Sequence, residues 1–222
     1  MANKSGNAYA LTVLCPILPG LPKQAPDGMN DQTHTDLVRL QLQRLPVNEL
    51  SPMARVPNTY LSRLWVLDDV PFQGRPAVLE HLKSNYLVFS SNFHGELDDY
   101  LRGMWSAIEP QIRAILQYCV GFNRVTDVAT FVDYVKRCQV ETTFFFNGSS
   151  DEPLAVQLKS LYLKQELAKF AAANQGKSSA DLQAAFKEFV ACVQQANLEG
   201  PTWKPGAYHL DRVVLEAEQS PT

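Results

Sequence analysis

Apolar and polar positions alternate with a period of two in several segments of the chain, which is typical of β-strands with one buried face. The first such run predicts a strand over residues 8–18. Similar runs predict strands over residues 59–67 and 85–93, both rich in aromatic and branched side chains. A fourth strand is predicted over residues 139–147, which contain three consecutive phenylalanines and end at an Asn-Gly pair.

Between these runs the apolar period lengthens to that of an α-helix. The pattern predicts helices over residues 31–45, 96–119 and 127–137. Pro110 lies inside the second of them and lacks an N–H for the helical ladder, so we expect it to break that helix into two arms. The connector between the second and third strands is expected to hold a short helix around residues 76–83.

The order strand-helix-strand, written twice, is that of the ferredoxin-like split βαβ arrangement, an antiparallel sheet with helices on one face. The predicted class is α+β, with a ferredoxin-like domain over residues 8–147. Strand signals stop after residue 151, and two apolar helical runs predict a helical hairpin over residues 152–197. We expect this hairpin to cover the open sheet face or a second subunit, and residues 198–222 to form an irregular tail.

Composition narrows the choice of partners. The chain has 222 residues, 45% hydrophobic and 19% charged, with a net charge of -3. Lys and Arg are scattered, so there is no basic footprint for a nucleic acid. The longest apolar stretch, residues 8–21, is interrupted by Pro and Gly and is shorter than the ~20 residues that a spanning helix needs, so no membrane span is expected.

The four cysteines show no metal-ligand or CxxC spacing, and each lies in an apolar segment, so we interpret them as reduced core thiols of a cytoplasmic protein. The alternative is a lipoprotein-type signal ending at Cys15, but bulky Leu14 stands where processing requires a small residue. Dinucleotide-binding, P-loop, hydrolase and zinc-protease motifs are absent. The four histidines form no pair at helical spacing, so the sequence indicates no metal site and specifies no cofactor.

Chemistry is expected on the sheet face that the helices leave open. Arg63 alternates with apolar residues along the second predicted strand, where its guanidinium could bind an anion. The alternative is an ion pair with a nearby carboxylate, such as Asp68, Asp69 or Glu141. His94 follows the third predicted strand and is a candidate general base, with a solvent-facing turn histidine as the alternative.

Three further polar residues lie on predicted strands. Tyr60 and Asn92 are candidate ligand-binding residues. Glu141 is a second candidate, besides His94, for the group that transfers a proton. Each has a structural alternative, because Tyr60 and Asn92 could serve in strand or subunit contacts and Glu141 could simply face solvent.

The strand at residues 9–15, the pair at residues 60–67 and 86–93, and the strand at residues 140–146 together resemble the dimeric α+β barrel superfamily. That group includes cofactor-free monooxygenases, stress-responsive barrel proteins, chlorite dismutases and dye-decolourising peroxidases. Residues 92–96 do not reproduce the GxxDG motif of the peroxidase branch. Residues 51–63 also resemble a segment of uncharacterised bacterial proteins in which a histidine commonly stands at the position of Tyr60.

These observations favour a homodimeric protein that binds a small apolar or weakly acidic molecule between the sheet and its cover. Cofactor-free oxidation is one hypothesis, with Arg63 orienting an anionic oxygen and His94 or Glu141 moving a proton. A second hypothesis is a non-catalytic dimerisation or interaction module. A third is a peroxidase-like haem protein with His94 or His209 as ligand.

Overall fold

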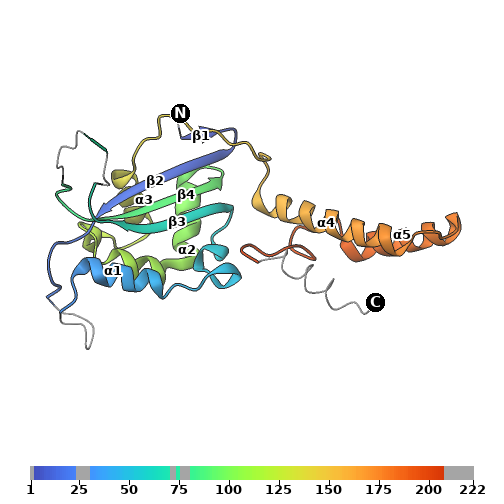
Figure 1. Cartoon of the computed structure of the whole chain (residues 1–222), viewed down its shortest axis with the longest axis horizontal. Helices are drawn as coiled ribbons and strands as arrows, with labels where there is room; N and C mark the ends of the chain where they lie inside the picture. Colours follow the sequence, from blue (N-terminus) through green and yellow to red (C-terminus); the bar gives the residue numbers. More distant parts are fainter. Residues whose placement is uncertain (1–2, 24–30, 71–73, 76–80, 208–222) are drawn as a thin grey trace. The chain divides into compact units, whose positions relative to one another are not determined.

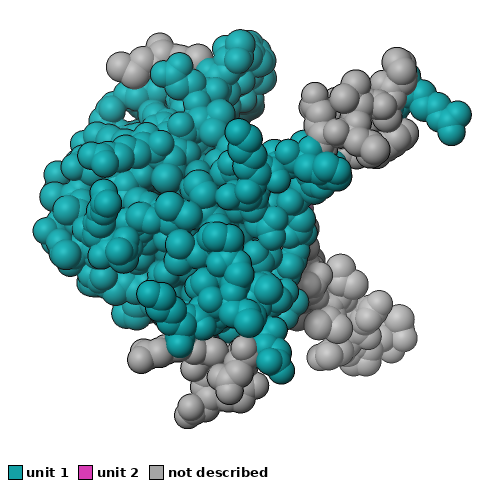
Figure 2. Space-filling view, turned by 90° about the vertical axis from the view of Figure 1, so that its left-hand side faces the viewer, with its two compact units in different colours: residues 1–46, 51–151 teal, residues 47–50, 152–222 magenta. Residues whose placement is uncertain are grey.

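The structure is a computed structural model that describes residues 3–23, 31–70, 74–75 and 81–207. The chain forms two compact units, the first of residues 1–46 with 51–151 and the second of residues 47–50 with 152–222. The first unit contains the sheet (Figure 1), and part of its surface is shown in teal in Figure 2. The second contains the C-terminal helices.

The sheet has four strands in the described residues: β1 (Lys4–Ser5), β2 (Ala8–Pro16), β3 (Thr59–Leu67) and β4 (Tyr86–His94). Their order is β1-β2-β4-β3, and every neighbouring pair is antiparallel. β2 and β3 therefore run parallel on either side of β4, with α1 (His34–Gln43) connecting them along the chain. The α+β class and the first three predicted strands are confirmed, with ends that differ by at most two residues.

The predicted fourth strand at residues 139–147 is wrong. Only Gln139 makes a bridge, to Val13, and the Val140 N–H donates to the Thr12 carbonyl at 2.9 Å. The reason is competition for one edge: β1 already pairs with the first residues of β2, and the Ala10 N–H donates to the Asn3 carbonyl. The segment therefore lies along this edge without a ladder.

Two of the three phenylalanines of this segment, Phe144 and Phe146, are 81% and 72% exposed. Consecutive aromatic side chains usually belong to a buried strand, which is the element that the sequence predicted here. Ladder pairing makes the side chains of a strand point alternately into and away from the core. This segment lacks that pairing, so its phenylalanine rings are not held inward.

The helices α2 (Leu97–Leu116) and α3 (Val128–Cys138) follow β4 and pack with α1 on one sheet face. Capping boxes begin α1 and α3, at Thr33 and Asp127 respectively. The expected break in α2 is confirmed as a kink at Ile108, whose φ of -142° and ψ of 29° are not helical. The described connections also hold short 3-10 helices, Asn48–Leu50, Pro52–Arg55 and Phe122–Arg124, while most of the helix expected at residues 76–83 lies outside the described residues.

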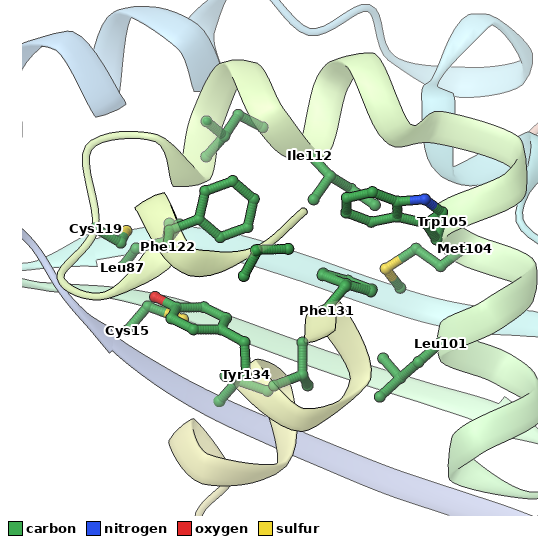
Figure 3. Close-up of a cluster of buried hydrophobic side chains, with 14 of the residues drawn as sticks. Cys15, Leu87, Leu101, Met104, Trp105, Ile112, Cys119, Phe122, Phe131 and Tyr134 are labelled. Atoms are coloured by element: carbon green, nitrogen blue, oxygen red, sulfur yellow. The ribbon is translucent and has the colours of Figure 1, made fainter. Parts of the chain in front are cut away.

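The core of the first unit lies between the sheet and these three helices (Figure 3). Tyr9 on β2 and Phe93 on β4 stack with ring centroids 5.2 Å apart, and Phe93 stacks on Tyr100 of α2 at 3.7 Å. The buried Tyr100 hydroxyl shares hydrogen bonds with the hydroxyl groups of Ser91 and Thr59, at 2.7 and 3.2 Å. Burial raises the pKa of Tyr100, which keeps this hydroxyl protonated and able to donate.

The second unit contains the predicted helical hairpin, α4 (Leu154–Ala173) and α5 (Ser179–Val193). An aromatic cluster of Phe170, Phe186 and Phe189 joins the end of α4 to α5. The indole N–H of Trp203 donates to Gln165 at 3.0 Å, so the segment after α5 returns to α4. None of the helices in the described part of the chain is long and apolar enough to span a membrane.

Candidate functional site

Four of the five predicted site residues lie on the two neighbouring strands β3 and β4. In the β3–β4 register, Leu61 is opposite Asn92, Arg63 opposite Ser90, and Trp65 opposite Val88. Side chains opposite each other in a register share a face, and the partly buried Leu64–Phe89 pair, which packs against the core, and the Ser62–Ser91 pair belong to the helix-covered face. Arg63 and Asn92 therefore lie on the other face, here called the open face.

Tyr60 and His94 are brought together at one end of the open face. The pairing of β3 shifts between Thr59 and Leu61, which leaves Tyr60 outside the regular alternation. Its hydroxyl lies 3.1 Å from Nδ1 of His94, and the two rings meet edge to face. A phenol and an imidazole in hydrogen-bond contact can pass a proton between them.

Arg63 is exposed, and two of its three predicted ion-pair partners, Asp68 and Asp69, are engaged elsewhere. The Asp68 carboxylate pairs with Arg39, and the Asp69 carboxylate accepts from His81 at 2.6 Å. This bond, with those from two backbone N–H groups, lowers the pKa of Asp69 to about 2. Among the described residues Arg63 forms no ion pair, so its guanidinium is available to an anion on the open face.

Glu141 does not join this group. It follows Val140 on the segment beside the outer edge of β2, whereas Arg63 lies on β3 at the opposite side of the sheet. Three strand spacings separate them, which is roughly 14 Å at about 4.8 Å per spacing. The sequence-based hypothesis that Arg63 and Glu141 act on one molecule within one chain is not supported by this topology.

A cavity of about 70 Å³ lies on the opposite, helix-covered side of the sheet. It is partly open to solvent and is enclosed by β2, β3 and β4, by the kinked part of α2 and by the segment before β3. Its walls are apolar apart from one glutamine: Val13, Cys15, Leu45, Pro52, Met53, Leu64, Leu87, Phe89, Met104, Ile108, Gln111, Ile112, Ile115, Leu116, Phe131 and Val135. Several of these side chains, including Met104, Ile112 and Phe131, are drawn in Figure 3.

Gln111 is the polar exception in this wall, and its Oε1 is buried with no hydrogen-bond partner among the described residues. Such an atom costs about 1–3 kcal/mol when it is left unpaired. The sequence analysis missed Gln111, although a signal was present. It stands three positions after Ile108 and seven after Met104, which places a polar residue in the buried stripe of α2 directly after the proline.

Within the described part of the chain, no group of three or more His, Cys, Asp or Glu side chains is arranged to hold a metal ion. His209, one of the two candidate haem ligands, lies outside the described residues. The chain matches no protein-family model, and no curated protein or solved structure is significantly similar to it.

Proposed function

We propose that this protein binds a small, mainly apolar molecule that carries one hydroxyl group, in the cavity between the sheet and α2. The observation that supports this proposal is the unpaired Gln111 oxygen in an otherwise apolar, partly open cavity. Ligand sites are typically apolar hollows with few polar groups that fix orientation. A hydroxyl suits either orientation of the amide, because it can donate to Oε1 or accept from Nε2.

The size of the cavity limits the ligand. A dry apolar cavity of about 150 Å³ admits benzene, and this cavity of about 70 Å³ is half as large. A single ring or the end of an alkyl chain therefore fits only if it extends through the open side or if the wall adjusts. Met53 and Met104 line the cavity, and methionine side chains adjust at low cost because they are flexible.

Phenol and benzene form a matched pair of probes for this site, since they differ by one hydroxyl. We expect phenol to bind the wild-type protein about fivefold more tightly than benzene, and Gln111→Leu to remove this preference, because one buried hydrogen bond contributes about 1 kcal/mol. Binding is measured by NMR titration of the Met104 and Ile112 methyl groups. Gln117→Leu, at the exposed C-cap position directly after the same helix, is the control.

Gln117→Leu should keep the full preference for phenol. An absence of methyl shifts with both probes, or an equal preference for phenol in wild type and Gln111→Leu, would contradict the proposal.

A second candidate is self-association through the open face, as in the ferredoxin-like dimeric barrels that the sequence resembles. It is favoured by Leu61 and Trp65, which lie four residues apart on this face, on either side of Arg63, and are 68% and 42% exposed. A second copy would cover these side chains. Arg63, Asn92 and the Tyr60–His94 pair would then border the space between the two sheets, where a weakly acidic ligand could bind and His94 could accept its proton.

Self-association predicts that Leu61→Glu converts a dimer to a monomer, because each dimer would have to bury two unpaired carboxylates. Sedimentation velocity measures the two species over the micromolar range. Leu21→Glu is the matched control, since the Leu21 side chain is exposed as well, at 55%, but lies outside the sheet. If the wild-type chain sediments as a monomer throughout this range, the second candidate is wrong.

A further inference from the structure

Three of the four cysteines gather in the first unit, where β2, the segment after α2 and the end of α3 meet. Cys15 and Cys119 are buried, and Cys138 is partly exposed as the last residue of α3. Gln139, the residue after Cys138, forms a bridge with Val13, two residues before Cys15, so the backbone brings Cys15 and Cys138 to neighbouring positions. Figure 3 shows Cys15 beside the Tyr134 ring.

Cys138 also borders a surface hollow of about 460 Å³. The wall of this hollow contains two exposed arginines, Arg124 and Arg137, which form no ion pair among the described residues, and one acidic residue, Asp133. A small oxidant can therefore reach the Cys138 sulfur from solvent, whereas Cys15 lies behind it in the core. Guanidinium groups near a thiol favour its thiolate.

We propose that Cys138 and Cys15 form a redox pair, in which a hydroperoxide oxidises Cys138 from the hollow and Cys15 then closes an intramolecular disulfide bond. The Val13–Gln139 bridge holds the two segments side by side, so a local shift can bring the two sulfurs to the about 2.05 Å of a disulfide bond. This inference is independent of the ligand cavity and of self-association, although Cys15 also borders the cavity.

The chemistry balances with a hydroperoxide as the only co-reactant. The Cys138 thiolate attacks one peroxide oxygen, an S–O bond forms, the O–O bond breaks, and water or an alcohol leaves after protonation. The Cys15 sulfur then attacks the Cys138 sulfur, an S–S bond forms, the S–O bond breaks, and a water molecule leaves with the Cys15 proton. Two thiols are oxidised by two electrons, and one peroxide is reduced.

The environments of the two thiols differ in the direction that these roles require. The hydrogen bond from Cys15 lowers the pKa of Cys138 to about 7, so a large fraction is thiolate near neutral pH. The same hydrogen bond, together with burial, raises the pKa of Cys15 well above its usual range. Burial raises the pKa of Cys119 to about 12, so this thiol stays protonated near neutral pH.

The test treats the reduced full-length protein with one equivalent of hydrogen peroxide and maps the products by mass spectrometry of peptides without reduction. We expect a Cys15–Cys138 cross-link and a loss of two hydrogen atoms in the intact mass. Cys138→Ser should slow formation of any disulfide about tenfold or more. Cys15→Ser should stop the reaction at a sulfenic acid on Cys138, which dimedone traps.

Cys192→Ser is the matched control, because Cys192 is an exposed cysteine of α5 in the other unit and should not affect the cross-link. The wild-type peptide map decides the question even if a core variant such as Cys15→Ser fails to fold. A map in which Cys192 is oxidised first, or in which Cys15 is linked to Cys119, would overturn the proposal.

Discussion

Replacing Phe93 with alanine is expected to lower the free energy of unfolding of the first unit by about 3–5 kcal/mol. The Phe93 ring is completely buried and stacks between Tyr9 of β2 and Tyr100 of α2. The substitution removes the central ring of this stack and leaves a cavity between the sheet and α2 that the neighbouring strands cannot close. Urea unfolding, followed by the fluorescence of Trp65 and Trp105, measures the loss.

Phe144→Ala is the control for this substitution, because the Phe144 ring is 81% exposed and the same change of volume there should alter stability by no more than about 0.5 kcal/mol. If Phe93→Ala costs less than about 1 kcal/mol, the aromatic stack does not hold α2 on the sheet as described.

Replacing Lys159 with methionine is expected to lower the stability of the second unit by about 2–4 kcal/mol. Lys159 is only 2% exposed, and its ammonium donates to the carbonyls of Val193 at 2.7 Å and Pro201 at 2.6 Å. Val193 ends α5, so its carbonyl has no partner within the helix and lies at the negative end of the helix dipole. Methionine retains the apolar stem but leaves both carbonyls without this donor.

Native-state hydrogen exchange of the α4 and α5 amides in the full-length chain measures this effect, because it reports on the second unit separately. Lys164→Met makes the same substitution at an exposed position of the same helix and should leave exchange almost unchanged. Equal protection of the hairpin in the Lys159→Met and Lys164→Met variants would show that the buried ammonium does not stabilise it.

The two lines of functional evidence occupy opposite faces of the same sheet. The cavity with Gln111 lies on the helix-covered face, and the Tyr60–His94 pair lies with Arg63 on the open face. Because β3 and β4 contribute to both faces through alternate residues, a ligand in the cavity and a second copy on the open face would contact the same two strands. The NMR and sedimentation experiments use different variants and therefore distinguish the two candidates.

The sequence by itself determined the features that depend on local periodicity. Alternation located β2, β3 and β4, and it indicated that Arg63 lies on the face away from the helices. The helical period located α2 and α3 and the hairpin, and the missing N–H of Pro110 indicated the kink in α2. Each of these depends on residues within a few positions of one another, so the information is present in the local pattern.

Only the tertiary structure decided the features that depend on competition and on contacts between distant segments. Residues 139–147 have the pattern of a strand, but β1 and Asn3 occupy part of the edge that they would need. The Tyr60–His94 contact arises from a register shift, and Cys15 and Cys138 become neighbours because the Val13–Gln139 bridge joins β2 to the end of α3. The unpaired oxygen of Gln111 and the buried ammonium of Lys159 likewise follow from which distant groups pack around them, and a local period carries no information about that.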